Sequence, residues 1–326
     1  MRRFLLRRLA WFALTVWAVI TISFVLMRSV PGGPLSSDRT LHPTVEAAVN
    51  ARYHLDWPAW RQYLQTLGPL NLDEHGLFGD RSDVFGGILA LDLGPSLQHR
   101  DVSVNEIVAQ SLPVSAALGV TALGWALLLG LVGGLVSALR PGTALDTSAR
   151  VLSTLGLSLP NFVIASFLVL ALAVALPIFP VAGWGSPAHL VLPGFALGAP
   201  FAAYVARLFR AGLLEALAQD CIRTARAKGV PWRSIVLRHA LPSALVPVIS
   251  FLGPAAAGIL TGSLVIERIF TIPGTGSHFV AGALNRDYAL AMGVTLVYTV
   301  LVYVLNLAVD LAHALLDPRL APEESA

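Results

Sequence analysis

The chain has 326 residues, of which 56% are hydrophobic and 13% are charged, and its net charge at pH 7 is +3. Because an ordinary soluble domain carries about 25% charged residues, this composition excludes such a domain and indicates a protein that crosses the membrane several times. The single cysteine, Cys221, excludes an intrachain disulfide framework and a metal site built from cysteines.

Six apolar segments contain no Asp, Glu, Lys or Arg and are long enough to cross a bilayer. A transmembrane helix needs about 20 apolar residues, so each segment predicts one span. The predicted spans are residues 9–27, 114–139, 151–176, 190–206, 240–266 and 288–309. The first follows a basic start, as a cleaved signal peptide would, but its apolar run is too long and no small-residue cleavage site follows. We therefore predict a retained helix.

The first two spans are separated by a long polar loop, residues 30–111. Its pattern predicts two short amphipathic helices, the first capped by Thr44 and the second by Asp56. Ser103 and Glu106 fit a capping box that leads into the second span. An ordered loop of about 80 residues favours a docking role; a solvated elaboration without a partner is the alternative.

Two local signals lie within the second and third spans. Gly130 and Gly134 form a G-x-x-x-G pair, which allows a close helix approach, within this chain or against a second subunit. Pro160 and Asn161 place a break and a polar side chain at moderate depth in the third span. Asn161 either lines a pathway or only bonds locally at a kink, and both interpretations stay open.

Residues 213–229, LLEALAQDCIRTARAKG, link the fourth and fifth spans and have the pattern of one amphipathic helix. The apolar positions of this helix are Leu214, Leu217, Ala218, Cys221, Ile222 and Ala225. Gly229 predicts a left-handed C-cap, and Pro231 stops the helix and begins the next one near Trp232. The segment therefore predicts a helix–turn–helix elbow that docks a partner. A basic loop that only fixes topology is the alternative.

The distribution of basic residues predicts the orientation. With the N-terminus in the cytoplasm, the inside segments carry 14 of the 22 Lys and Arg residues. Six of the other eight lie in or beside the long loop, which escapes the positive-inside rule. Both termini and the elbow are therefore predicted to be cytoplasmic.

Motifs for chemistry are missing from the sequence. The only lysine, Lys228, follows Ala227, so there is no phosphate-binding P-loop, and the H-E-x-x-H and nucleophile-elbow motifs are also missing. Ion-coupled transporters keep an ionisable residue in the bilayer, whereas all six predicted spans lack one. The chain is predicted to be no enzyme. It supplies a pathway, either as a passive channel or with a motor on another subunit.

The elbow resembles the EAA loop of type I ABC-importer permeases, E-A-A-x-x-x-G followed after nine residues by I-x-L-P. When Gly229 is aligned with the glycine of this pattern, Arg223, Thr224 and Ala225 stand at the E-A-A positions. His239 then stands at the isoleucine, and Leu241 and Pro242 match L-P. Arg223 replaces the glutamate of the general pattern, and R-T-A-R-A-K-G is the usual form in the peptide-transporter branch. Three further blocks agree: the N-terminal segment, LDLGPSL at residues 91–97, and ERIFTIPGTGSHF with the sequence after it. The chain is identified as a member of the dipeptide/oligopeptide permease family, as the subunit with a long first external loop.

The resemblance implies an all-α polytopic membrane protein with six transmembrane helices in the type I ABC-importer permease fold, a core of five helices plus an N-terminal helix. Residues 1–29 would form a cytoplasmic tail and the first helix, and residues 30–111 the external loop. Residues 112–317 would form the permease core with a coupling loop at about 212–242, and residues 318–326 a cytoplasmic tail. The implied location is the bacterial inner membrane.

The resemblance also implies partners. A homologous second permease, a different chain or a second copy, would complete the pathway. Two cytoplasmic ABC ATPases would bind ATP and Mg²⁺ and seat the elbow, and an external binding protein would deliver the solute. Dipeptides or oligopeptides are the expected solutes, with nickel chelates or glutathione as alternatives, and an exporter or passive channel is the competing class. No catalytic, metal or nucleic-acid site is expected in this chain.

The resemblance assigns three groups of site residues. The ATPase-coupling positions are Arg223, Thr224, Ala225, Arg226, Lys228, Gly229, Leu241 and Pro242. The positions at an outer gate or binding-protein contact are Glu267, Phe270, Pro273, Gly274 and Gly276, for which a plain re-entrant turn is the alternative. Asn161 is the candidate pathway residue. Arg223 is expected to meet an acidic partner residue or its own neighbour Asp220.

Overall fold

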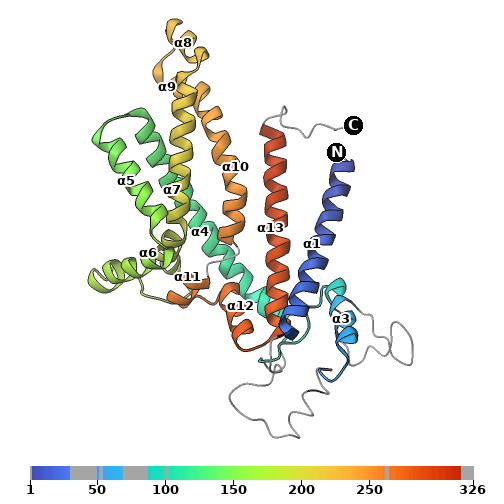
Figure 1. The fold of residues 1–326 in the computed structure, drawn as a ribbon. Coiled ribbons are helices and arrows are strands. Elements are labelled where there is room, and N and C mark those ends of the chain that lie inside the picture. Colours follow the sequence, from blue (N-terminus) through green and yellow to red (C-terminus); the bar gives the residue numbers. More distant parts are fainter. Residues whose placement is uncertain are drawn as a thin grey trace. The chain divides into compact units, whose positions relative to one another are not determined.

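The structure is a computed structural model that describes residues 2–29, 50, 54–68, 87–99, 102–260 and 264–316. Within these ranges the regular structure is helical, with a single isolated bridge between Pro95 and Ser103. The chain divides into two compact units. The first consists of Met1–Pro113 and Gly274–Val300, and the second of Val114–Pro273 and Leu301–Ala326. Figure 1 labels the helices of both units.

The first unit is built from parts of the chain that are far apart in sequence. Its elements are α1 (Arg2–Ser29), α3 (Ala59–Leu67), η1 (Ile88–Ala90), the first turns of α4 (Val104–Leu139), α12 (Thr275–Leu284) and the first half of α13 (Tyr288–Leu316). Its apolar core consists of Val104, Ile107, Val108, Leu290 and Val294. Side chains from the start of α4 and from α13 therefore share one core in this unit.

The predicted capping box at the start of α4 is confirmed. The Ser103 backbone N–H donates to the Glu106 carboxylate at 3.3 Å, and the Glu106 N–H donates to the Ser103 hydroxyl at 3.2 Å. One residue after Val104, Asn105 accepts from the backbone N–H of Leu93 and donates to the carbonyl of Leu91. These bonds fix the LDLG segment against the first turn of α4.

The cap predicted for α3 is wrong. The N-cap is Pro58, with extended backbone and no side-chain cap, so Asp56 lies outside the helix. The amide of Gln62 instead donates to the carbonyls of Leu55 and Trp57, which ties the approaching chain to α3. The other predicted cap, Thr44, lies outside the described residues.

Five described helical segments are long and apolar enough to cross a membrane. They are Leu6–Ser29 of α1, Val104–Leu139, Ala188–Ala218, Trp232–Ala256 and Tyr288–Ala308. These segments match the first, second, fourth, fifth and sixth predicted spans. Orientation across the membrane stays a prediction.

The predicted third span is not one straight helix. It consists of α5 (Ala144–Ser158) and a second piece, Asn161–Ala175, bent by 108° relative to the first. Leu159 and Pro160 are extended, with ψ of 129° and 141°. A proline has no N–H and pushes the preceding residue out of the helical region, so the bend follows from the sequence. The pair is either one broken span or a re-entrant loop, which gives six spans in the first case.

Helix α7 (Ala188–Ala218) is the centre of the second unit. It packs against α5, α6 (Asn161–Leu168) and α10 (Leu241–Leu260). The other elements of this unit are η2 (Val169–Ala175), α8 (Asp220–Ala227), α9 (Trp232–Ser234), η3 (Ile235–Ala240), α11 (Leu264–Ile269), the rest of α4 and the end of α13.

The glycine pair of α4 faces α7. A methyl group added to Gly130 would lie 2.6 Å from the side chain of Val205, and one added to Gly134 would lie 2.8 Å from the carbonyl oxygen of Ala206. Contacts this short do not occur for real side chains, so only glycine allows the two helices to pack so closely. Packing within the chain, one of the two predicted uses of this pair, is confirmed.

Candidate functional site

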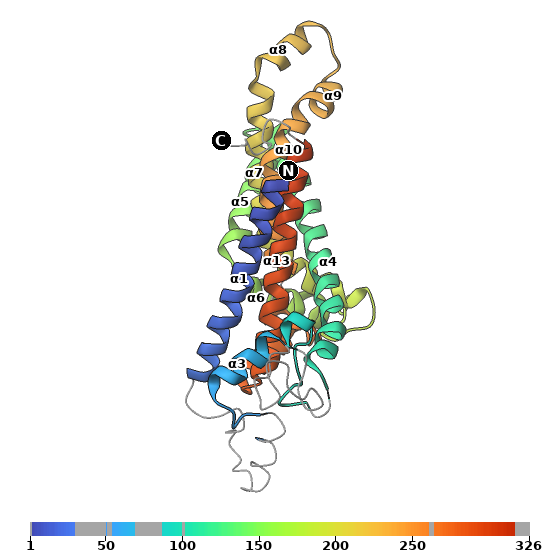
Figure 2. The ribbon, with the colours of Figure 1, turned by 90° about the vertical axis from the view of Figure 1, so that its right-hand side faces the viewer.

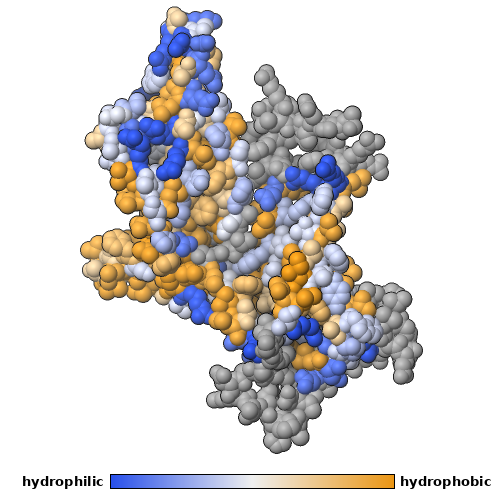
Figure 3. Space-filling view, viewed as in Figure 1, coloured by the Kyte–Doolittle hydropathy of each residue, from blue (hydrophilic) through white to orange (hydrophobic). Residues whose placement is uncertain are grey.

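The elbow lies where α7 and α10 are joined by α8 and α9 (Figure 1). In the turned view α8 and α9 form the end of a projection that continues α7 and α10 (Figure 2). The surface of this end is mostly hydrophilic, whereas the surface around α6 is largely hydrophobic (Figure 3). Within the second unit, the elbow is therefore a polar element at the end of apolar helices.

The predicted single helix over residues 213–229 is wrong. Helix α7 ends at Ala218, and Gln219 is extended, with φ −67° and ψ 151°. The carbonyl of Gln219 accepts from the backbone N–H groups of Ile222 at 3.1 Å and Arg223 at 3.4 Å, so Gln219 is the N-cap of α8. The break lets α8 leave the direction of α7.

The break also changes which side chains are buried. Leu213, Ala216 and Ile222 are buried, whereas Ala218 and Cys221 are exposed, although the single-helix pattern placed both on the apolar stripe. The other predicted stripe positions, Leu214, Leu217 and Ala225, are half-buried. Spacing of i, i+3 and i+4 defines one stripe only in a continuous helix, and an extended residue rotates the second half against the first.

The predicted C-cap at Gly229 is confirmed. Gly229 has φ +75°, its N–H donates to the carbonyl of Arg226 at 3.0 Å, and the N–H of Val230 donates to the carbonyl of Ala225 at 3.2 Å. These two bonds form a Schellman motif, and Val230 and Ala225 both pack on the same apolar cluster. No atom lies within 4 Å of a methyl group added to Gly229, so the backbone angle, and not the space, requires glycine.

The chain returns toward the membrane helices through Pro231, which is the N-cap of α9. The guanidinium of Arg226 lies 4.5 Å from the centre of the Trp232 ring, a cation–π contact that braces α8 against α9. Buried Ile222 and Ile235 join one apolar cluster with Leu213 of α7. The two arms of the elbow thus share a core with the end of the helix that precedes them.

The predicted coupling positions are together on this elbow. Arg223, Thr224, Arg226, Lys228 and Gly229 are exposed, and Ala225 is half-buried. Leu241 and Pro242 follow η3 at the start of α10, Leu241 half-buried and Pro242 exposed. The structure therefore exposes the four polar coupling side chains and Pro242, whereas Ala225 and Leu241 are half-buried.

Arg223 contacts Asp220, one of the two expected partners. Its guanidinium lies 3.4 Å from the Asp220 carboxylate, and the two side chains are 78% and 94% exposed. A pair so exposed is screened by water and salt and contributes little to stability. Most of the guanidinium surface is thus open to an incoming protein.

The predicted outer-gate positions divide between the two units. In the second unit Glu267 is fully buried and accepts a hydrogen bond from the Ser115 hydroxyl at 2.8 Å, Phe270 is buried, and Pro273 is exposed. In the first unit Gly274 is the N-cap of α12 and Gly276 is buried. A direct contact with a binding protein stays a prediction for this group, with Pro273 its accessible member.

Asn161, the candidate pathway residue, is the first residue of α6 and lies directly after the bend. Its side chain is half-buried. The predicted break is confirmed at this place, while the pathway role stays a prediction.

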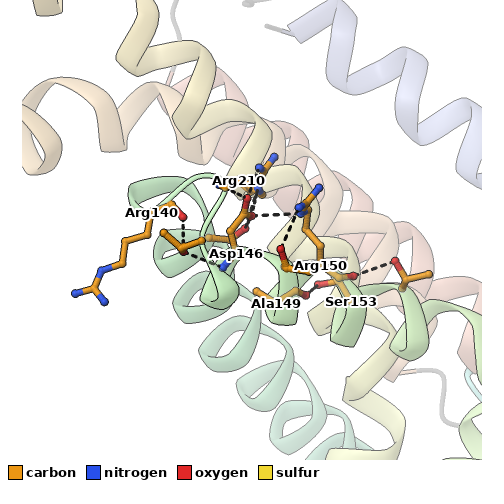
Figure 4. A network of polar contacts seen from close by, with 11 residues as sticks. Arg140, Asp146, Ala149, Arg150, Ser153 and Arg210 are labelled. Atoms are coloured by element: carbon orange, nitrogen blue, oxygen red, sulfur yellow. Dashed lines mark hydrogen bonds and ion pairs between the residues drawn. The ribbon is translucent and has the colours of Figure 1, made fainter.

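Sequence reasoning missed a buried polar network around Asp146 (Figure 4). The Asp146 carboxylate is 2% exposed and accepts from both ends of the Arg210 guanidinium fork at 3.0 and 3.2 Å. It also accepts from the Ser137 hydroxyl and from the Gly142 backbone N–H. Arg210 also donates to Ser137, so the network joins α4, α5 and α7. A lone acid in the basic stretch RPGTALDTSAR was the available signal.

Comparisons with known proteins agree with this geometry. The family model described as "Binding-protein-dependent transport system inner membrane component" matches residues 130–322. The dipeptide transport system permease protein DppB of Bacillus subtilis (strain 168) is 42% identical over 320 residues, covering 98% of both chains. The oligopeptide transport system permease protein OppB of Escherichia coli (strain K12) is 42% identical over 322 residues, covering 98% of this chain and 99% of that one.

Among solved structures, a chain of the MetNI methionine ABC transporter in an inward-facing conformation has a similar fold. The TM-score is 0.55, the sequence identity is 18%, and the match covers 65% of this chain and 97% of that chain.

Proposed function

Because the chain belongs to the family of binding-protein-dependent transport system inner membrane components, we propose that it is the permease subunit of an ABC importer for dipeptides or oligopeptides. With a second permease it would form the translocation pathway. The peptide specificity is supported by relatives that match nearly the whole chain and are named as dipeptide and oligopeptide permeases.

The observation that carries the proposal is the capped elbow between α7 and α10. Its backbone is closed by the Schellman motif at Gly229, and its arms are held by the contact of Arg226 with Trp232. Its exposed surface carries Arg223 and Lys228. A short, internally bonded, basic element at the end of two membrane helices suits a groove on a cytoplasmic protein with acidic side chains.

Mechanical coupling follows from the packing of the elbow. Ile222 and Ile235 share one apolar cluster with Leu213 of α7, with Ala240 at the end of η3 and with Ala244 in the first turn of α10. Protein cores are close-packed, so displacement of the elbow moves the ends of both helices together. Movement of the ATPases would in this way tilt two walls of the pathway.

The remaining partners follow from the same proposal. Two cytoplasmic ABC ATPases bind ATP and Mg²⁺ and seat the elbow, and an external binding protein delivers the peptide. Arg223, whose one ion pair within the described ranges is the solvent-screened contact with Asp220, is the residue we assign to an acidic side chain of the ATPase. The chain itself hydrolyses nothing.

The test is the substitution Gly229→Val in the assembled transporter. A β-branched residue at φ +75° is strained by about 1–2 kcal/mol, so the cap should open and the elbow should lose its shape. We expect the peptide-stimulated ATPase rate to fall to the basal rate while the chain still reaches the membrane.

The matched control is Gly185→Val. Gly185 has φ +127° with open space around it, so a β-branched residue is strained there too, but the turn lies outside the elbow and outside the Asp146 network. Peptide-stimulated ATPase activity in this control should stay close to that of the wild type. Unchanged stimulation in Gly229→Val, or equal losses in both variants, would exclude the elbow as the coupling element.

A further inference from the structure

A second site lies in the second unit, in a groove between α4, α5 and α7. The cavity has a volume of about 330 Å³. Four of the residues that line it are small: Gly133, Ala149, Ala206 and Ala211. Three arginines line it, Arg150 from α5 and Arg207 and Arg210 from α7. Figure 4 shows Arg150 and Arg210 reaching Asp146, whereas the side chain of Arg140 extends away from them.

The groove keeps a positive net charge when the carboxylate of Asp146 is set against the three arginines. Asp146 pairs with Arg210 at 3.0 Å and lies 3.5 Å from Arg150. No ion pair to Arg207 is found among the described residues, and both Arg150 and Arg207 are exposed. Three guanidinium groups and one carboxylate leave a net charge of +2, so the groove favours a ligand with negative charge.

The hydroxyl groups of the groove are already committed. Ser153 donates to the carbonyl of Ala149, Thr154 donates to the carbonyl of Arg150, and Ser137 donates to Asp146. The donors that a ligand meets are therefore the guanidinium groups. Arginine forms paired hydrogen bonds with phosphate oxygens, so a phosphate group fits these donors better than a neutral polar group does.

The helices that form the groove expose apolar side chains on their other faces. Leu145, Leu152 and Leu155 of α5 are 48–68% exposed, and Val132 of α4 is 53% exposed. Surfaces of this kind face acyl chains when the helices lie in a bilayer. The groove therefore belongs to helices whose other faces suit contact with lipid, which places anionic headgroups within its reach.

We propose that this groove binds the headgroup of an anionic phospholipid, with the phosphate between Arg150 and Arg207. Basic pockets between transmembrane helices are known to hold anionic headgroups at the cytoplasmic side. The inference rests on the proposed function for its membrane setting. Arg210 is one turn from Arg207 and eight residues before the end of α7, about 12 Å from the elbow by helical rise. A bound lipid would thus tie α5 to the helix that enters the elbow.

The experiment measures lipid retention by native mass spectrometry on the full chain without its partners, after exchange into detergent with phosphatidylglycerol or with phosphatidylcholine of the same acyl chains. The wild type should retain phosphatidylglycerol in preference. R150Q/R207Q should weaken this retention about 25-fold, since each basic side chain contributes roughly a factor of five, and should leave the retention of phosphatidylcholine unchanged.

Three controls decide the outcome. R150K/R207K keeps the charge and should restore most of the retention, which separates binding from misfolding. R140Q removes a charge directly after α4 that does not line the groove, and this variant should retain as much phosphatidylglycerol as the wild type. Glycerol phosphate, which has the headgroup chemistry without acyl chains, should not displace the lipid at millimolar concentration.

The proposal is overturned if R140Q loses as much lipid as R150Q/R207Q, or if the wild type holds both lipids equally. Displacement by glycerol phosphate would identify a site for soluble anions instead. Since no ATPase is present, these results stand whether or not the elbow variants lose coupling.

Discussion

The elbow and the Asp146 network use charge in opposite ways. Both contain an arginine close to the end of α7: Arg223 follows that helix in the elbow, and Arg210 lies within it in the network. In the network, Asp146 is buried and its bonds to Arg210, Ser137 and Gly142 are internal. In the elbow, Asp220 and Arg223 form one exposed pair. The elbow takes its shape from backbone caps and apolar contacts instead, which leaves its charges for a partner.

The largest expected effect is the difference in stability between variants of the two acids, Asp146 and Asp220. Asp146→Ala leaves the half-buried Arg210 without its carboxylate, and an uncompensated charge inside a protein is strongly destabilising. Asp220→Ala removes a 94% exposed group and should not change stability. Thermal unfolding of the detergent-solubilised chain should show a clear decrease in Tm for the first variant and none for the second. Equal Tm values for the two would mean that the network does not hold the three helices together.

An intermediate effect is expected from the apolar side of the elbow. Ile222→Ala removes a side chain that is 1% exposed and should cost about 2–4 kcal/mol in the free energy of unfolding. Its neighbour Cys221 is exposed, so Cys221→Ala should be silent. Chemical unfolding measures the free energy of unfolding of both variants. A loss in Ile222→Ala alone shows that the elbow is packed against the core. An ordinary surface substitution changes the free energy of unfolding by up to roughly 0.5 kcal/mol. A loss for Ile222→Ala within this range would contradict the shared core with α7.

The smallest effect on stability should come from Arg223→Ala, because its only described ion pair is exposed. Its effect on function should be specific: the affinity of the permease for the ATPases should fall and should lose part of its salt dependence. Titration of ATPase into reconstituted permease at low and high salt measures both. Asp220→Ala is the control, since it removes the internal partner of Arg223 and should not weaken the affinity.

Much of the fold follows from local sequence. Length and lack of charge predict five spans that the structure describes as long apolar helices, and Gly229 predicts its own left-handed turn. Pro160 carries the signal for the bend, but its size of 108° depends on what α6 packs against. Local patterns therefore predict where helices stop more reliably than where they point.

The missed features depend on contacts between distant residues. The helical spacing before and after Gln219 is continuous in the sequence, whereas in the structure Gln219 is extended and Ile222 packs with Ile235 and Leu213. The Asp146 network joins Ser137 to Arg210, which are 73 positions apart in the sequence. The substitution of arginine for glutamate at position 223 is visible in the sequence, but the exposure of its pair with Asp220 is not.

The exposed side chain of Cys221 has a practical consequence. It is the only cysteine of the chain, and the break at Gln219 places it on the surface of α8, beside the buried Ile222. A thiol-reactive fluorophore would therefore attach at one position without any engineered residue. That position is on the surface proposed to meet the ATPases, so the unmodified sequence already contains a reporter for their arrival and departure during a transport cycle.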